Sequence, residues 1–242
     1  MSGTSEMETS EPGDEGFATS IVSLFHGPLV KIRLEPSNRE YTVSKNLLCA
    51  ESPVFSDTFE GSFSESKKQT AILQEMEGVV SVRSVEALIQ WLYFGNIKFD
   101  ESFEEICIEA AVELARLAEM YEITRIEDPI ARYIKRMYTT TGNIHDEYKE
   151  YRRYLELEDE EKILGTVLRD SHPVRRLMAQ AFVVSYLRRD AHPNGLMTQK
   201  CPKFGADLLY EVKLTLDTLS HYDSATVKDP ITGKRRHLKW ED

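Results

Sequence analysis

Histidine and cysteine side chains carry much of the metal and nucleophilic chemistry of proteins, and in this sequence they are scattered. No two of the six histidines lie three or four residues apart, the spacing that would place two metal ligands on one helical face. These histidines are His26, His145, His172, His192, His221 and His237. The three cysteines, Cys49, Cys107 and Cys201, are also far apart and fit reduced thiols. The motifs G-x-S-x-G, H-E-x-x-H and G-x-G-x-x-G and the phosphate-binding loop are missing from the sequence. We therefore expect a protein that is not an enzyme and that has no catalytic residue, cofactor or metal site.

The charge balance and the hydropathy exclude further classes. The 242 residues include 30 Lys and Arg against 41 Asp and Glu, so the formal net charge is −11. A negative field repels a phosphate backbone, so nucleic acid is not an expected partner. No apolar run approaches the roughly 18 residues of a membrane-spanning helix. The first twenty residues hold acidic side chains and no Lys or Arg, unlike a secretory signal. We expect a protein of the cytoplasm, the nucleus or both, with no membrane association.

The first 140 residues combine strand and helix patterns. Residues 1–16 are rich in Ser, Thr and Glu, which predicts a disordered acidic tail. Apolar and charged residues alternate over 30–43 around a Pro-Ser-Asn turn, which predicts a β-hairpin. A further strand is predicted over 70–76. Apolar residues at helical spacing predict helices over residues 17–25, 45–59 with a break at Ser52-Pro53, 85–94 and 103–121, and from Asp128 onwards.

The sequence beyond residue 141 has a helical pattern. Residues 143–162 are highly charged, which predicts a solvated helix or a linker. Two amphipathic helices are predicted, the first entered at Pro173 and the second containing Leu208 to Leu219. The basic cluster 233–237 is part of a solvated tail, a nuclear import signal or a weak nucleic-acid contact. The predicted organisation is an acidic tail (1–16), a mixed domain (17–140), a helical region (141–226) and a basic tail (227–242).

Four segments, in order along the chain, resemble the BTB/POZ family. Residues 41–59, YTVSKNLLCAESPVFSDTF, are similar to its pattern of aromatic-x-Val-His-Lys, two apolar residues and Ser-Pro-x-Phe. Residues 61–65 (GSFSE), 88–95 (LIQWLYFG) and 114–121 (LARLAEMY) are similar to a turn and two helices of the family. The resemblance implies an α+β fold with a small three-stranded sheet flanked by helices, followed by an all-α C-terminal extension. The last hundred residues resemble, more weakly, the extensions of BTB proteins abundant in fungi.

The resemblance implies a protein–protein interaction module, and many members are substrate adaptors or scaffold subunits of cullin-type ubiquitin ligases. In those members an apolar-x-acidic motif before a long helix contacts the cullin. The matching residues here are Phe103 and Glu105, with Asp100 shortly before them. Glu105 would also close a capping box that starts at Ser102, and Phe103 would begin the apolar stripe of the same helix. The implied partners are a cullin-type scaffold, a client protein and a second copy of the chain.

A second surface that the resemblance implies is a homodimer interface. Ile21, Leu24 and Phe25 would lie on one helical face and either form this interface or pack on their own chain. Two positions depart from the family pattern, because Ser44 stands in place of a His and Pro28 lies near the place of an Asp that helps to build the interface. Proline also lacks the N–H that an exchanged strand would use. The alternative function is a self-associating nuclear or transcriptional regulator that uses the domain for oligomerisation.

Overall fold

A three-stranded sheet forms one end of the molecule. The computed structural model describes residues 25, 27–62, 64–99, 104–140, 168–188, 202–220 and 225–238. Strands β1 (Leu29–Glu35) and β2 (Glu40–Ser44) form the antiparallel hairpin expected from the sequence. Strand β3 (Thr70–Gln74) lies parallel to β1, so the strand order is β2-β1-β3. The predicted α+β class and the small sheet are confirmed.

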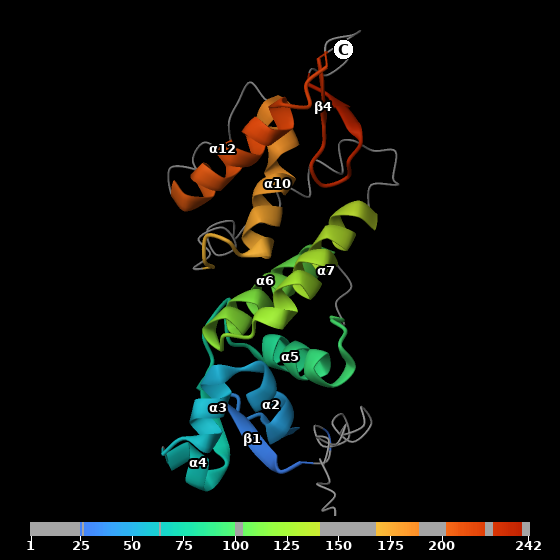
Figure 1. The fold of residues 1–242 in the computed structure, drawn as a ribbon. Coiled ribbons are helices and arrows are strands. Elements are labelled where there is room, and N and C mark those ends of the chain that lie inside the picture. The colour runs from blue at the N-terminus through green and yellow to red at the C-terminus, as the bar shows by residue number, and fades with distance from the viewer. Residues whose placement is uncertain are drawn as a thin grey trace, which may run out of the picture.

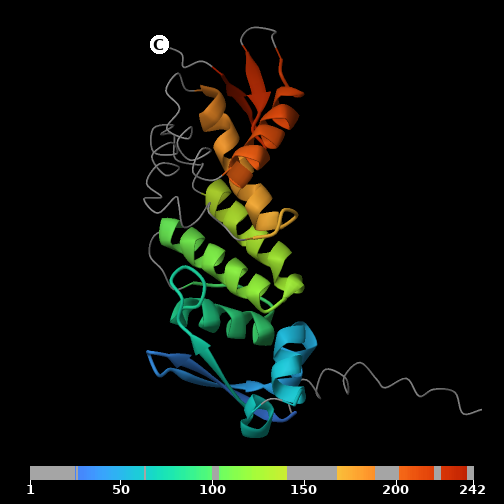
Figure 2. The ribbon, with the colours of Figure 1, turned by 90° about the vertical axis from the view of Figure 1, so that its left-hand side faces the viewer.

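The two faces of the sheet differ in the way that the sequence alternation predicts. In β1, Val30, Ile32 and Leu34 are at most 1% exposed, whereas Lys31 points to solvent. Residues on one face of a strand recur every second position, so a single register buries all three apolar side chains together. The helices of the N-terminal region (residues 25–140) cover this buried face (Figure 2).

The first helices begin and end at the residues that local capping chemistry predicts. The Ser44 side chain caps α2 (Lys45–Glu51), and the Ser52 side chain caps α3 (Pro53–Glu60) by accepting a hydrogen bond from the Phe55 N–H. A further short helix, α4 (Ser64–Lys68), lies in a segment for which no helix was expected. None of its five residues is buried, so hydrophobic periodicity gave no signal for it.

Three longer helices stack above the sheet end of the molecule (Figure 1). They are α5 (Val82–Phe94), α6 (Glu104–Met120) and α7 (Glu127–Thr140), with a 3₁₀ turn over Thr124–Ile126. The middle helix, α6, packs against both of the others. Its Ala110, Ala111, Ala115 and Ala118 are completely buried, and such small side chains allow neighbouring helices to approach closely. The strong helical periodicity of this segment is therefore confirmed.

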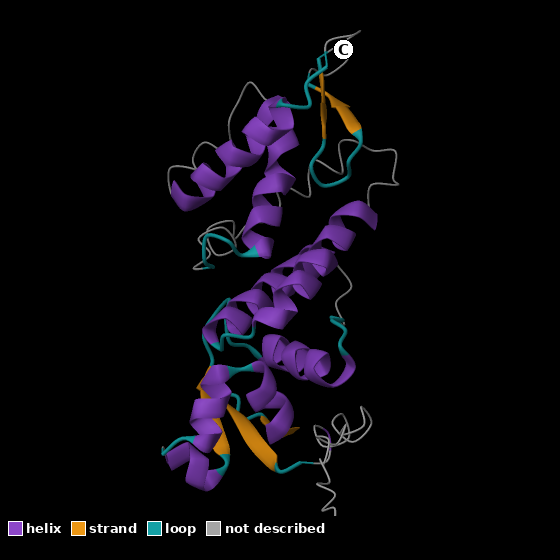
Figure 3. Cartoon of the chain, in the orientation of Figure 1, coloured by secondary structure: helices purple, strands orange, loops and turns teal. Residues whose placement is uncertain are grey.

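A C-terminal extension (residues 168–238) continues the stack on the other side of α7. It contains α10 (Pro173–Arg188), which packs on α7, and α12 (Pro202–Leu216), which packs on α10. The extension is mainly helical, but the expectation of an all-α extension ending in a basic tail is wrong in one respect. Strands β4 (Thr226–Lys228) and β5 (Arg235–His237) form an antiparallel hairpin at the end of the molecule far from the sheet (Figure 3).

The reason for this hairpin is a structured turn with two buried apolar residues. Val227 and Ile231 are at most 4% exposed. The Asp229 carboxylate accepts hydrogen bonds from the N–H groups of Ile231 and Thr232, and Gly233 takes a positive φ of 70°. Asp and Gly stabilise such turns because Asp bonds to nearby backbone and Gly tolerates positive φ.

Several predicted segments lie outside the described residues. They include the acidic tail 1–16, the charged stretch 143–162 and most of the helix predicted over 17–25. Cys201 is also outside them, whereas Cys49 and Cys107 are described and neither forms a disulfide. Within the described ranges, no helix has the length and hydropathy needed to span a membrane.

Candidate interaction surfaces

The segment that carries the predicted cullin contact is reached from a firmly held end of α5. Gly95 caps α5 in the left-handed conformation with φ 64°, which favours glycine. The Lys98 N–H then donates to Gln90 Oε1 at 2.8 Å. Phe99 is 9% exposed, and its ring stands edge-on to that of Tyr133 at a centroid distance of 5.5 Å. The chain therefore approaches the predicted contact from a packed aromatic residue.

The predicted contact residues themselves are only partly covered by the structure. Asp100 and Phe103 lie outside the described residues. Glu105 is the second residue of α6, but its side chain is not among those that the structure describes. The capping box at Ser102 likewise falls outside, so both the contact and the cap stay predictions.

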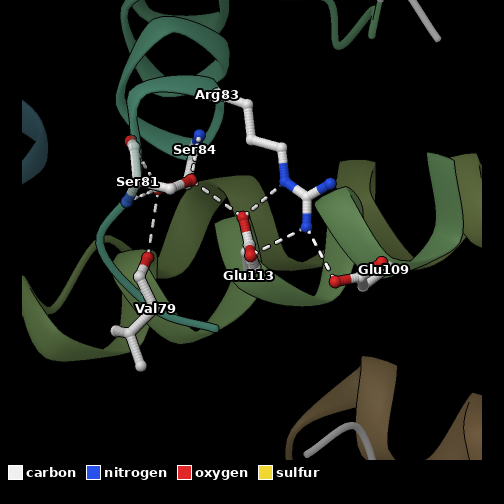
Figure 4. A network of polar contacts seen from close by, with 6 residues as sticks. All are labelled: Val79, Ser81, Arg83, Ser84, Glu109 and Glu113. Atoms are coloured by element: carbon white, nitrogen blue, oxygen red, sulfur yellow. Dashed lines mark hydrogen bonds and ion pairs between the residues drawn. The ribbon is translucent and has the colours of Figure 1, made fainter. Parts of the chain in front are cut away.

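A polar network fixes α6 against the start of α5 (Figure 4). Arg83 donates from Nε and Nη2 to the two carboxylate oxygens of Glu113 at 2.7 and 2.8 Å, and from Nη2 to Glu109 at 2.9 Å. The Ser81 hydroxyl donates to Glu113 Oε2 at 2.8 Å and also accepts from the N–H of Ser84 in a capping box. The hydrogen bonds to Glu113 raise the pKa of Arg83 above its usual value. The network holds the long helix rigidly beside the helix that precedes it.

The end of α5 also exposes a large aromatic side chain that the sequence interpretation did not select. Phe94 is 75% exposed, the most exposed of the large hydrophobic residues that the structure describes. It directly precedes the capping Gly95 and lies six residues before Asp100. Aromatic residues are enriched at protein interfaces, so Phe94 is a candidate contact residue at the end of α5. Its place in the helical motif gave no indication of its exposure.

The predicted dimer surface is represented by one residue. Phe25 is 40% exposed, and its ring lies 6.1 Å from that of Tyr93 on α5. Tyr93 also accepts a hydrogen bond from the Ser44 N–H at 2.8 Å. Phe25 therefore contacts its own chain and still presents part of its ring to solvent, together with Leu29 at 57% exposure. Ile21 and Leu24 lie outside the described residues, so the interface as a whole remains a prediction.

A comparison with protein families identifies the N-terminal region. The BTB/POZ domain model matches residues 26–151, which is more than half of the chain. The chain belongs to the BTB/POZ family. The resemblance read from the sequence is thereby confirmed, and with it the coarse function of a protein–protein interaction module. No match is found among curated proteins.

A salt bridge joins the BTB domain to the extension. Both carboxylate oxygens of Glu127, the first residue of α7, accept from the Arg169 guanidinium at 2.7 and 2.5 Å. The Arg169 N–H also donates to Glu119 of α6 at 2.7 Å. Such two-pronged pairs have a fixed geometry as well as a favourable energy. The pair therefore fixes the orientation of the extension on the BTB domain, and no local signal in the sequence indicates it.

A buried histidine lies directly behind this salt bridge. His172 is completely buried, and its Nδ1 accepts from the Val174 N–H at 3.2 Å. The pKa of His172 is lowered to about 4, chiefly by burial, with Glu127 opposing the shift and the nearby Arg169 adding to it. The imidazole is therefore uncharged at neutral pH and acts as part of the packed junction.

Inside the extension, a buried arginine connects its elements. Arg175 donates from Nε to Asp207 of α12 at 2.5 Å and from Nη1 to Asp170 at 2.6 Å. It also reaches the Leu168 carbonyl oxygen at 3.2 Å. Arg176 similarly pairs with the buried Glu211 of α12 at 2.7 Å. The sequence interpretation missed these residues, because the partners on α12, Asp207 and Glu211, lie 32 and 35 positions away.

The described residues include potential metal ligands and the Cys49 thiol. Among them no group of three or more His, Cys, Asp and Glu side chains is arranged to hold a metal ion. Burial raises the pKa of the Cys49 thiol, which opposes formation of a reactive thiolate. What the geometry offers is a set of exposed side chains on a rigid, elongated support.

Proposed function

We propose that this protein is a substrate adaptor or scaffold subunit of a cullin-type ubiquitin ligase. In this proposal the BTB domain binds the cullin and the extension binds the client. The observation that carries it is the rigid attachment of the extension. Helix α10 packs along α7, and Arg169 clamps Glu127, so a client on the extension would be held at a fixed place relative to the BTB domain.

The arrangement of the elements supports the proposal that the BTB domain and the extension bind different partners. The three-stranded sheet and the β4–β5 hairpin lie at opposite ends of the helix stack, with α5, α6 and α7 between them (Figure 1). A client at the hairpin end would therefore leave the sheet end accessible to another partner. Phe103 would fill an apolar pocket of the cullin, while Glu105 and Asp100 would meet basic residues at the rim.

The direct test is the binding of the purified chain to a recombinant cullin by biolayer interferometry. Phe103→Ala combined with Glu105→Lys is expected to weaken binding by about a hundredfold, because a central aromatic residue and a paired charge are both lost. Leu209→Ala combined with Asp217→Lys is the matched control, since both residues are exposed, the first in α12 and the second directly after it. This control variant is expected to bind like the unmodified chain.

Because Glu105 is also a predicted capping residue, the double variant can lose stability as well as contact. Asp100→Lys alone changes the predicted contact outside α6 and is expected to weaken binding by about tenfold at an unchanged melting temperature. Undiminished cullin binding by folded forms of both variants would refute the proposed contact. An unmodified chain that binds no cullin would refute the adaptor function.

A second function, a self-associating nuclear regulator, is supported by the exposed apolar side chains near the N-terminus. Phe25 and Leu29 are 40% and 57% exposed, and such residues are often covered by a partner. Light scattering over a range of concentrations tests self-association, with Phe25→Ala and Leu29→Ala expected to reduce it.

The proposed location is the cytoplasm, the nucleus or both. Because residues 235–237 form β5, the import signal is best tested by Lys234→Glu, at the residue just before this strand, and not by deletion.

A further inference from the structure

A hollow of about 400 Å³ lies where α7 of the BTB domain meets the extension. Its walls come from three elements that are far apart in the sequence. Lys135 belongs to α7, Leu214 to α12, and Lys228, Pro230 and Thr232 to the β4–β5 hairpin and its turn. In Figure 1 the turn of the hairpin points towards the C-terminal end of α7. Most of the lining therefore belongs to the extension, and α7 of the BTB domain contributes Lys135 to one wall.

The two acidic residues in the lining are neutralised by their own chain. Glu211 is 3% exposed and accepts hydrogen bonds from Arg176 at 2.7 Å and from Gln180 at 3.0 Å. Asp229 is 7% exposed and accepts from two N–H groups of its turn, and its other oxygen lies 3.6 Å from Nε of Arg236. Neither carboxylate is left to balance further positive charge in the hollow.

The two lysines of the lining are not paired in this way. Among the described residues, no carboxylate lies within ion-pair distance of the amine of Lys135 or Lys228, and both side chains are exposed. The backbone N–H of Lys228 donates to Thr218 Oγ1 at 2.8 Å, which fixes the start of its side chain. The side chain of Lys228 runs beside the turn, because its Cε lies 3.7 Å from the position that a Cβ on Gly233 would occupy. The hollow thus carries uncompensated positive charge from two separate elements.

We propose that this hollow binds an acidic peptide segment of the client protein. Carboxylates of the peptide would pair with Lys135 and Lys228, and an apolar side chain between them would pack on Leu214 and Pro230. The proposal rests on the proposed adaptor function and specifies the class of segment that the extension takes.

Charge complementarity favours this occupant. In the described residues of the extension Lys and Arg outnumber Asp and Glu, whereas acidic residues outnumber basic ones in the described BTB domain. An acidic peptide is therefore drawn towards the extension and away from the BTB domain. A nucleic acid fits less well, because its long polyanionic backbone would meet the net charge of −11 and has no use for the apolar contact at Leu214.

The test uses the full chain and a fluorescein-labelled hexapeptide of two leucines flanked on each side by two glutamates. Binding is followed by fluorescence anisotropy. The unmodified chain is expected to bind this peptide and not the analogue in which glutamine replaces each glutamate. Lys135→Glu with Lys228→Glu should weaken binding by about tenfold or more, since two attractive charges become repulsive.

The matched control is Lys67→Glu with Lys213→Glu, which makes the same change of charge at exposed lysines outside the hollow. The dissociation constant of this control variant for the glutamate peptide is expected to lie within about twofold of that of the unmodified chain. An equal loss in both double variants would show unspecific attraction and overturn the proposal. Failure of the unmodified chain to bind the glutamate peptide would overturn it too, as would tighter binding of a short DNA duplex that is lost in the Lys135 and Lys228 variant.

The same variants separate this inference from the proposed function. Lys135→Glu with Lys228→Glu is expected to retain cullin binding, because both lysines line the hollow and neither belongs to the predicted cullin contact at Asp100, Phe103 and Glu105. Cullin binding without peptide binding would overturn the peptide site alone. Peptide binding without cullin binding would leave the peptide site in place and overturn the adaptor function.

Discussion

The interiors of the BTB domain and of the extension differ in their share of buried polar side chains. In the BTB domain the largest completely buried side chains are apolar, and Phe55 stacks on Tyr121 at 4.4 Å with an interplanar angle of 6°. The extension is shorter, yet it buries a comparable set of polar side chains. Those that are at most 7% exposed are His172, Arg175, Glu211, Thr215 and Asp229.

This difference has consequences for stability and for specificity. Apolar packing depends little on pH or salt, so the BTB domain should keep its fold over a wide range of conditions. Buried ion pairs gain little net energy because both ions lose their hydration, but losing one partner is costly. The extension is therefore expected to be the more sensitive region, and its polar contacts specify one docked position.

The largest effect is expected from truncating the apolar core of the BTB domain. Phe55→Ala should lower the free energy of unfolding by about 4 kcal/mol, because a 1% exposed ring loses its stacking on Tyr121 and Phe59 and leaves a cavity. Urea denaturation followed by circular dichroism measures it. Phe94→Ala makes the same substitution at a 75% exposed site and should change stability by less than about 0.5 kcal/mol. Similar losses for both would contradict the packing described for α3.

The next effect concerns the buried arginine of the extension. Arg175→Met should cost about 3 kcal/mol, because Asp207 and the Leu168 carbonyl lose their partner. Hydrogen exchange should accelerate in α10 and α12 and stay unchanged in the strands of the sheet. The control, Arg125→Met, breaks an ion pair to Glu51 at an arginine that is 77% exposed and should cost under about 1 kcal/mol. If hydrogen exchange in Arg175→Met accelerated equally in the sheet and in the extension, the extension would not be the more sensitive of the two regions.

A third effect is a loss of stability in mild acid. The pKa of His172 is about 4 in the folded chain and is expected near 6.5 when unfolded, so the unfolded chain takes up the proton first. Stability is therefore complete above about pH 6.5 and falls as the pH decreases towards 4, by about 2 kcal/mol at pH 4.5. Urea denaturation at several pH values measures this slope. His172→Gln should flatten the slope of stability against pH, whereas His237→Gln, at an exposed site, should leave it unchanged. An unchanged slope in His172→Gln would show that other groups cause the loss of stability.

The smallest effect tests the polar network of the BTB domain. Ser81→Ala removes the cap of α5 and one hydrogen bond to Glu113, and should cost about 1 kcal/mol in a urea titration. The matched control is Ser56→Ala, whose hydroxyl bonds only to an exposed glutamate side chain, Glu60. If Ser81→Ala lowered the free energy of unfolding as much as Arg175→Met, the two regions would not differ in their sensitivity to the loss of a polar contact.

Much of the BTB domain followed from local patterns. The alternation of Val30, Ile32 and Leu34 predicted β1, and Ser52 followed by Pro53 predicted the break between α2 and α3. Gly95 predicted the end of α5. Each of these signals acts within a few residues, because strand periodicity, capping and positive φ depend on neighbouring backbone groups. The segment around Phe103 was selected by resemblance, and its contact awaits the cullin experiment.

The hairpin at the C-terminus and helix α4 did not follow from such patterns. Strands β4 and β5 have three residues each, too few for a clear alternation, and β5 is composed of basic residues. What holds the hairpin is the burial of Val227 and Ile231 and the pairing of Asp229 with Arg236. These contacts depend on α12, which places the ordered turn beside it.

The sequence by itself determined the three strands of the sheet, several helix limits of the BTB domain and the BTB family, because all of these depend on short-range order of residue types. Only the tertiary structure decided that Arg169 meets Glu127, that Arg175 meets Asp207, and that Lys135 and Lys228 line one hollow. Side chains so far apart along the chain leave no periodic trace. Their pairing is fixed by how whole helices pack, and helix packing is decided by the summed fit of many apolar surfaces.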